Sequence, residues 1–135
     1  MNRRPVSLAE VVSETLAGQR FDPLLREFLD DFYGAETQAK QAAIAEESAF
    51  IAAIQDAYLA AVAEHLALRF HLETPGWSEG PRRFLSRPFF AGGLEGLKAL
   101  LLVESPLAFR RRQIFVSADA LSRPRDREAT PLAPP

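Results

Sequence analysis

Residues 50–72, FIAAIQDAYLAAVAEHLALRFHL, decide the fold class of this chain. Apolar side chains recur there at steps of three and four residues, from Phe50 through Tyr58 to Phe70, which is the spacing of a helix. They occupy most of the helix circumference, so we expect a central helix that is covered on several sides. The abundant alanines favour helix and let neighbouring helices approach closely.

The helix signal extends upstream of this stretch, because no proline or glycine occurs from Glu36 to Leu72. Proline and glycine are the residues that most often interrupt a helix, so their absence over this length predicts helix. Two arrangements stay open: one long helix, or two helices with a break near Glu46-Glu47-Ser48.

Two shorter helices are predicted before this region. SLAE at residues 7–10 is a capping-box pattern, with a serine hydroxyl at the N-cap and a carboxylate three residues later. Gly18 is the expected end of that helix. For the next helix we expect Asp22 as N-cap, Pro23 as first helical residue and Gly34 as the end.

The predicted fold is mainly α: a single-domain helical bundle around the alanine-rich helix, with a small irregular C-terminal region. Trp77 and Phe84 are the expected anchors of that region, which is predicted to include a short helix after Gly92-Gly93 and one short strand within Gln113–Val116.

We expect a single domain over residues 1–123. It comprises an acidic helical part, residues 1–74, and a basic part rich in arginine and aromatic residues, residues 75–123. The proline-rich tail, residues 124–135, is predicted to be disordered.

The composition is that of a globular protein and narrows the functional classes. The chain has 135 residues, of which 47% are hydrophobic, and no cysteine, which excludes disulfides, thiolate zinc sites and cysteine nucleophiles. No apolar run approaches the ~20 residues that a membrane span needs. The N-terminus has no long apolar segment of the kind found in secretion signals. We therefore expect a cytoplasmic protein with no membrane association.

Charge is divided unevenly along the chain. Residues 1–74 carry 6 basic and 12 acidic side chains, whereas residues 75–135 carry 10 basic and 6 acidic ones. Arginine outnumbers lysine nine to one in the second part, and guanidinium groups suit bidentate contact with carboxylate or phosphate. The predicted partner-binding residues are Arg82, Arg83, Arg87, Arg110, Arg111, Arg112, Trp77, Phe89 and Phe90.

Three interpretations of the arginines stay open: an internal clamp, a surface for an acidic protein, and a nucleic-acid site. In an extended chain, Arg110, Arg111 and Arg112 would point alternately to opposite faces, so at least one is expected to face inward, toward an acid of the N-terminal helices. The formal net charge of −2 and the lack of a recognisable nucleic-acid module weigh against the third interpretation.

No residue pattern predicts an active site. His65 and His71 are six residues apart, on different faces of a helix, and HExxH, GxSxG and phosphate-loop motifs are absent. Asp56, Glu64 and His65 interrupt an apolar helix and support one alternative, a small helical metal or carboxylate enzyme. We expect no catalytic residue, no metal and no cofactor.

Several segments together resemble a known group of proteins. AEHLA at 63–67, Pro75 with Trp77, RPFF at 87–90 and ESPLAFRRRQIFVSADALSR at 104–123 are similar to a widespread group of uncharacterised small bacterial proteins. These share the pattern AEHLA…PxW…RPWF…ESPxxFRRRxIFV…LSR. The present chain departs from it by having phenylalanine in place of the tryptophan of RPWF.

The resemblance implies a function. Members of the group look like partners of neighbouring nucleotidyltransferase-type proteins, in the manner of toxin–antitoxin pairs, and some carry an N-terminal helix-turn-helix. The first 34 residues here are too short and too lightly basic for that motif. We therefore expect a non-enzymatic interaction protein, an antitoxin that binds its partner directly, with a DNA-binding transcriptional regulator as the alternative. The flat alanine-rich face also favours a homodimer.

Overall fold

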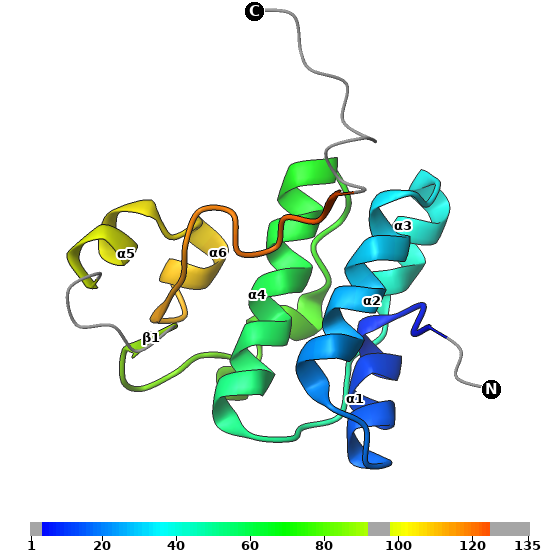
Figure 1. Cartoon of the computed structure of the whole chain (residues 1–135), viewed down its shortest axis with the longest axis horizontal. Coiled ribbons are helices and arrows are strands. Elements are labelled where there is room, and N and C mark those ends of the chain that lie inside the picture. The colour runs from blue at the N-terminus through cyan, green and yellow to red at the C-terminus, as the bar shows by residue number, and fades with distance from the viewer. Residues whose placement is uncertain (1–3, 92–97, 125–135) are drawn as a thin grey trace, which may run out of the picture. The chain divides into compact units, whose positions relative to one another are not determined.

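The chain is mainly helical, as the sequence predicts, in a computed structural model that describes residues 4–91 and 98–124 (Figure 1). Contacts between Cα atoms group the chain into two compact units. Unit 1 consists of Met1–Ala49 with Leu121–Pro135, and unit 2 of Phe50–Ala120. The single domain expected over residues 1–123 stays a prediction.

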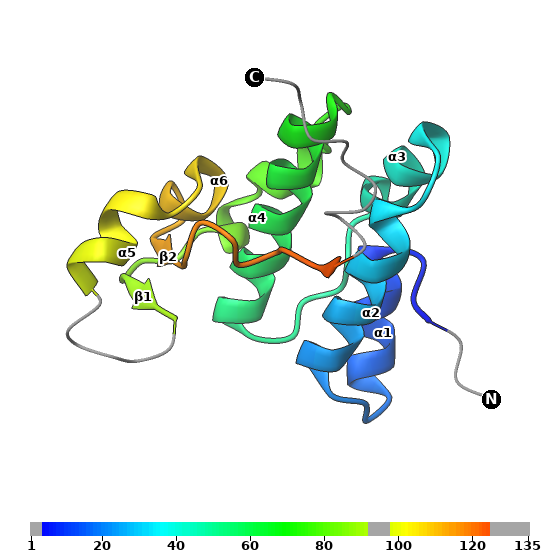
Figure 2. The same ribbon diagram turned by 45° about the horizontal axis from the view of Figure 1, so that its top comes forward.

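Unit 1 is built on three helices, α1 (Leu8–Leu16), α2 (Phe21–Tyr33) and α3 (Thr37–Ala45). Each of the three contacts the other two, and Figures 1 and 2 show α1 and α2 side by side. Their buried apolar side chains form the core of the unit, including Leu8, Val11, Val12, Leu24, Leu25, Phe28, Leu29, Phe32 and Ile44.

The capping signals of α1 are confirmed. The Ser7 hydroxyl accepts a hydrogen bond from the Glu10 N–H at 3.1 Å, and the Glu10 carboxylate accepts one from the Val6 N–H at 2.9 Å. At the other end Gly18 adopts a φ of 111°, a conformation that side-chain-bearing residues rarely adopt. Local sequence therefore sets both ends of this helix.

The predicted start of α2 is wrong by two residues. The helix begins at Phe21 with Arg20 as its N-cap, rather than at Pro23 after Asp22. Pro23 then lies within the first turn, where backbone N–H groups have no intrahelical acceptor and a missing one costs nothing. Gly34 ends the helix as predicted.

The proline-free and glycine-free region forms two helices, which resolves the open alternative. After α3 ends at Ala45, α4 runs over Ala53–Phe70. Phe50 and Ile51 lie in the connection rather than on the helix, and the Ile51 N–H donates to the Asp56 carboxylate at 2.7 Å.

The end of the described chain belongs to unit 1. The Tyr33 hydroxyl donates a hydrogen bond of 2.8 Å to the Leu121 carbonyl, and both groups are buried. Arg123 forms two hydrogen bonds to the Asp30 carboxylate, at 2.8 and 3.3 Å. These contacts join Leu121 and Arg123 to α2.

In unit 2, short elements pack against α4. Its 3-10 helices η1 (Gly76–Glu79) and η2 (Pro81–Arg83) and its helix α6 (Leu107–Arg110) contact α4. Helix α5 is described over Lys98–Glu104. The irregular region predicted after residue 74 is thus confirmed.

A two-stranded parallel sheet completes unit 2. Strand β1 (Phe89–Phe90) pairs with β2 (Ile114–Phe115), with Phe89 opposite Ile114 and Phe90 opposite Phe115 (Figure 2). The short strand predicted within Gln113–Val116 is therefore present, and it has a partner strand along one edge. The Ser105 hydroxyl accepts a hydrogen bond of 2.9 Å from the Val116 N–H, which ties the end of β2 to the end of α5.

Two expectations fall on residues outside the described ranges: the helix entry at Gly92-Gly93 and the tail beyond residue 124. Within residues 4–91 and 98–124, none of the helices combines the length and the apolar character that crossing a membrane requires.

Candidate functional site: an arginine–carboxylate cluster

All nine predicted partner-binding residues belong to unit 2, and their exposure divides them into three groups. Arg83 and Arg112 are fully buried, with relative exposures of 0%. Trp77, Phe89 and Phe90 are half-buried, and Arg82, Arg87, Arg110 and Arg111 are exposed. Two of the nine predicted partner-binding residues, Arg83 and Arg112, therefore lie in the interior and cannot contact a partner.

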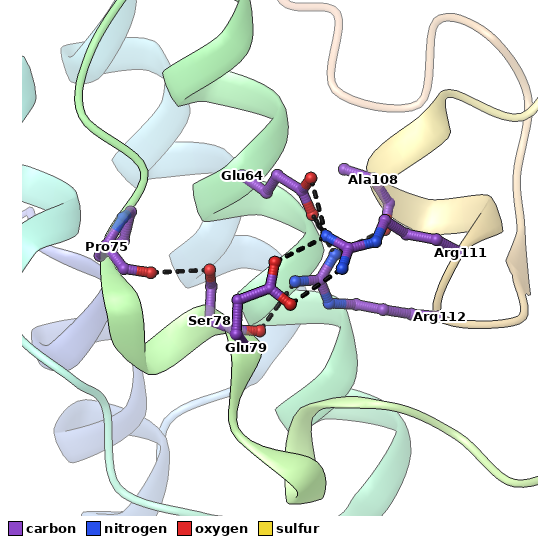
Figure 3. Close-up of polar contacts among 7 residues, drawn as sticks. All are labelled: Glu64, Pro75, Ser78, Glu79, Ala108, Arg111 and Arg112. Atoms are coloured by element: carbon purple, nitrogen blue, oxygen red, sulfur yellow. Dashed lines mark hydrogen bonds and ion pairs between the residues drawn. The ribbon is translucent and has the colours of Figure 1, made fainter.

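Arg112 is one of the two fully buried arginines. One of its terminal nitrogens donates to the Glu64 carboxylate at 2.5 Å and to the Ala108 carbonyl at 2.8 Å, and the other donates to the Ser78 carbonyl at 2.8 Å. Figure 3 shows this guanidinium group between Glu64 and Ser78. A buried charge is tolerated where an opposite charge and further hydrogen bonds compensate it, as they do here.

Arg111 joins two carboxylates. It makes a bidentate contact with Glu79, in which both nitrogen–oxygen distances are 2.8 Å, and it also donates to both oxygens of Glu64 at 2.8 and 2.9 Å (Figure 3). Its hydrogen bonds hold the pKa of Glu79 below the ordinary value. The contacts with Glu79, and then with Glu64, raise the pKa of Arg111. We call Glu64, Glu79, Arg111 and Arg112 the arginine–carboxylate cluster.

The backbone separates the three consecutive arginines. Arg110 is the last residue of α6, and a turn follows in which the Arg112 N–H donates to the Phe109 carbonyl at 3.0 Å. Gln113 then takes a positive φ of 63°, which directs the chain into β2. The arginines therefore lie on a turn rather than on an extended chain. Arg110 is exposed, and no ion pair to it forms within the part of the chain that the structure describes.

The ring of Phe84 lies against the guanidinium groups of Arg111 and Arg112. The central carbons of Arg111 and Arg112 lie 5.3 and 4.7 Å from the centre of the Phe84 ring. Stacking of this kind orients a planar cation and leaves its edge free to donate hydrogen bonds.

Phe50 and Trp77 form a second arginine–aromatic contact. Arg82 and Arg83 lie 3.8 and 4.2 Å from the centre of the Phe50 ring, and Arg83 lies 4.7 Å from that of Trp77. Arg83 also donates to the Asp56 carbonyl at 3.2 Å. Arg83 is thus a core residue that holds η2 against the start of α4.

The remaining predicted aromatic residues belong to the small sheet. The Phe90 ring stacks on Phe115 with 5.0 Å between centres, and the Lys98 ammonium nitrogen lies 5.2 Å from the centre of the Phe90 ring. Phe89, one strand position earlier, lines a cavity beside the first residues of α4.

The residues proposed for a metal or carboxylate enzyme do not converge on a common point. The Asp56 carboxylate accepts from the Ile51 N–H, Glu64 is bound by two arginines, and the His65 ring lies 6.0 Å from that of Phe109. Among residues 4–91 and 98–124, no group of three or more histidine, aspartate and glutamate side chains is placed to hold a metal ion.

Sequence reasoning missed Glu79, Ser78 and Phe50 as members of these contacts. Glu79 carried a weak signal, because it is the one acid within the basic stretch that runs from Trp77 to Arg87. Ser78 contributes its backbone carbonyl to Arg112, and a backbone group leaves no trace in the sequence.

Two cavities open on unit 2 beside the start of α4. One, of about 340 Å³, is lined by residues that include Ile54, Arg87 and Phe89, and the other, of about 290 Å³, by residues that include Phe50 and Arg82. Comparisons of the chain with protein-family models, with curated proteins and with solved structures found no match.

Proposed function

We propose that the protein is a non-enzymatic interaction protein that acts as an antitoxin, binding a nucleotidyltransferase-like toxin encoded by a neighbouring gene. The proposal rests on the sequence resemblance, which covers residues 50–123, a range that includes all of unit 2. Arg83, Arg111 and Arg112 lie in internal contacts, so the partner surface is drawn from the exposed residues of this unit.

The structural observation that carries the proposal is that three exposed arginines have no counter-charge among the described residues. Arg82, Arg87 and Arg110 are exposed and form no ion pair within residues 4–91 and 98–124, whereas Arg111 and Arg112 are compensated by Glu64 and Glu79. Guanidinium groups without an internal counter-charge are suited to the carboxylates of a partner.

Exposed apolar side chains accompany these cations on unit 2. Helices α5 and α6 expose Leu100, Leu102, Val103 and Leu107, with relative exposures between 46% and 76%. Neighbouring large apolar side chains at a surface are typical of protein interfaces, in which apolar contact supplies affinity and charge supplies orientation.

The mechanism that we propose is occlusion. The exposed arginines and the aromatic residues beside them engage acidic residues at the metal-binding active site of the toxin. Once those carboxylates are held by guanidinium groups, they are no longer available to the catalytic metal ion or to substrate. No chemistry by the antitoxin is required.

Co-expression of the full chain with the product of the neighbouring gene tests this function. We expect the two proteins to elute as one complex in size-exclusion chromatography, and the growth defect caused by the partner to be relieved. A variant with Arg82, Arg87 and Arg110 all replaced by glutamate should fold, as judged by circular dichroism, and fail to bind. Separate elution of the two wild-type proteins would contradict the proposal.

A further inference from the structure

The two cavities beside the start of α4 are adjacent, because they share Ala53 and Phe84. We call these two adjoining cavities of unit 2 the α4 groove. Its apolar lining comes mainly from Phe50, Ile54, Phe84, Leu85, Pro88 and Phe89. Each half contains one cation, Arg82 in one and Arg87 in the other.

Positive charge exceeds accessible negative charge in the groove. Arg82 stacks on Phe50 at 3.8 Å, a contact that orients the guanidinium group and leaves its charge without a carboxylate. Both cations are exposed, and neither forms an ion pair with another described residue. Asp56 is the acid of the lining, but it is 3% exposed and its carboxylate accepts from the Ile51 N–H at 2.7 Å. The groove therefore presents two accessible positive charges on an apolar floor.

We propose that the α4 groove binds an extended acidic segment of a partner protein. Two carboxylates of the segment contact Arg82 and Arg87, and an apolar side chain between them packs on Phe84. This inference rests on the proposed function and places the contact with the acidic segment at Arg82 and Arg87, the two exposed arginines that line the groove.

Chain geometry limits the spacing of the two acids. Arg82 and Arg87 are five residues apart, so their Cα atoms are separated by at most about 18 Å, the length of five extended residues. The two acids of the partner segment must match the separation of the guanidinium groups, which is set by this short backbone span and by the reach of the two arginine side chains. The recognition pattern is therefore a short motif with an acid on each side of an apolar residue.

A nucleic acid fits this groove less well than an acidic peptide. Phosphates recur at every nucleotide and are bound by rows of cations, whereas the groove offers two arginines and an apolar lining. The formal net charge of the chain, −2, gives no long-range attraction to polyanions.

Charge reversal in the complex is the first test. We compare Arg82→Glu/Arg87→Glu with Arg26→Glu, an exposed arginine of unit 1 that has no place in the proposed partner surface, and measure the affinity for the co-expressed partner by calorimetry. The double variant should bind at least about tenfold more weakly and Arg26→Glu within about threefold of wild type. Arg82→Lys/Arg87→Lys, which keeps both charges, should retain most of the affinity. Equal binding by the wild type and the double glutamate variant would overturn the groove and leave the proposed function standing.

A second test applies if the wild-type chain forms no complex with the neighbouring gene product, which is the failure of the proposed function. A random peptide library displayed on phage is then selected against the immobilised full-length protein. Enriched peptides should place acids on both sides of an apolar residue, and a labelled copy should lose at least about tenfold in affinity for Arg82→Glu/Arg87→Glu. The groove proposal fails if enriched peptides lack acids, if the double variant binds them unchanged, or if a 20-nucleotide single-stranded thymidine oligomer displaces them.

Discussion

Arg112 carries its charge into the interior of unit 2, where its side chain has no exposed surface. Glu64, with 10% of its side chain exposed, provides the opposite charge, and the Ala108 and Ser78 carbonyls accept two further hydrogen bonds. Such a pair contributes little net stability compared with apolar residues of the same shape, but the loss of one partner leaves a buried charge without compensation. Glu64 and Arg112 should therefore be strongly dependent on each other.

Replacing Glu64 by glutamine tests that dependence. Glu64→Gln keeps the size of the side chain but removes the charge opposite Arg112, so we expect it to lower the free energy of unfolding by about 3–5 kcal/mol. Glu79→Gln is the matched control, because Glu79 is 49% exposed and the same change should cost under about 1 kcal/mol. Urea denaturation of the two variants measures the difference. Equal losses would mean that Arg112 is not compensated by Glu64.

The contact between Glu79 and Arg111 should make stability depend on acid pH. Hydrogen bonds from Arg111 lower the pKa of Glu79 in the folded state below its ordinary value of 4.5. The unfolded chain therefore takes up this proton first as pH falls, so the stabilisation is present above pH 4.5 and is lost as pH passes below the folded-state pKa. The melting temperatures of wild type and Glu79→Gln should differ at pH 7 and converge below that pKa. A difference that stays constant with pH would contradict this reasoning.

At the residue scale the sequence predicted the kind of contact but not its members. An arginine facing an acid of the helical part was expected, and Glu64 was singled out because it interrupts an apolar helix. Which arginine would be buried depends on the turn after α6 and on the Ser78 carbonyl, 34 residues away from Arg112. Contacts between distant segments of this kind are decided by tertiary packing, which leaves no periodic signal in the sequence.

At the scale of single elements, helix ends with a local cause were predicted well. Ser7 acts through its side chain and Gly18 through a positive φ, and each lies at a helix end as expected. Gly34 also ends its helix as expected, with a φ of −95° that any residue can adopt. The break between α3 and α4 contains no proline or glycine. There the Asp56 carboxylate accepts from the Ile51 N–H, a bond that competes with helix and is visible only in the structure.

Removing the cap of α1 should destabilise unit 1. Ser7→Ala deletes the acceptor of the Glu10 N–H, and we expect a loss of about 1 kcal/mol in the free energy of unfolding. Ser13→Ala, an exposed change within the same helix, is the control and should be neutral or slightly stabilising because alanine is the better helix former. Chemical denaturation followed by circular dichroism compares the two. A cap of no importance would give both variants the stability of wild type.

The link between α5 and β2 should depend on one hydroxyl group. Ser105→Ala leaves the Val116 N–H without its acceptor in a residue that is 2% exposed, at a cost of about 1–3 kcal/mol. The Val116 amide should then exchange with deuterium faster than in wild type. The Tyr33 amide, in unit 1, serves as the internal reference. Unchanged protection of Val116 would show that Ser105 does not hold the end of this strand.

At the scale of the whole molecule, oppositely charged side chains pair within each of the two units. Asp30 and Asp31 of unit 1 pair with Arg123 and Arg4, and in unit 2 the arginine–carboxylate cluster contains two positive and two negative side chains. Internal pairing was one of three interpretations that the sequence left open. Arg123–Asp30 and Arg112–Glu64 join the acidic part to the basic part, whereas nothing in the sequence indicated that such pairs divide between two units. The exposed arginines that pair with none of the described residues are too few to track a phosphate backbone.

Duplex DNA should therefore not bind. With a formal net charge of −2 and most cluster charges compensated, we expect no saturable binding of a 30-base-pair duplex below about 100 μM protein at physiological salt. Fluorescence anisotropy at 50 and 200 mM salt makes the measurement. Binding that weakens steeply between the two salt concentrations would instead favour the DNA-binding regulator.

The hydrogen bond from Tyr33 to the Leu121 carbonyl spans 88 positions of the chain, and all of unit 2 lies between its two ends. On a ribosome, translation therefore delivers every residue of unit 2 before the segment that completes unit 1. The contacts of the Tyr33 hydroxyl with the Leu121 carbonyl and of the Asp30 carboxylate with Arg123 can form only after that segment leaves the exit tunnel. The first helices to be synthesised would then be among the last parts of the protein to mature.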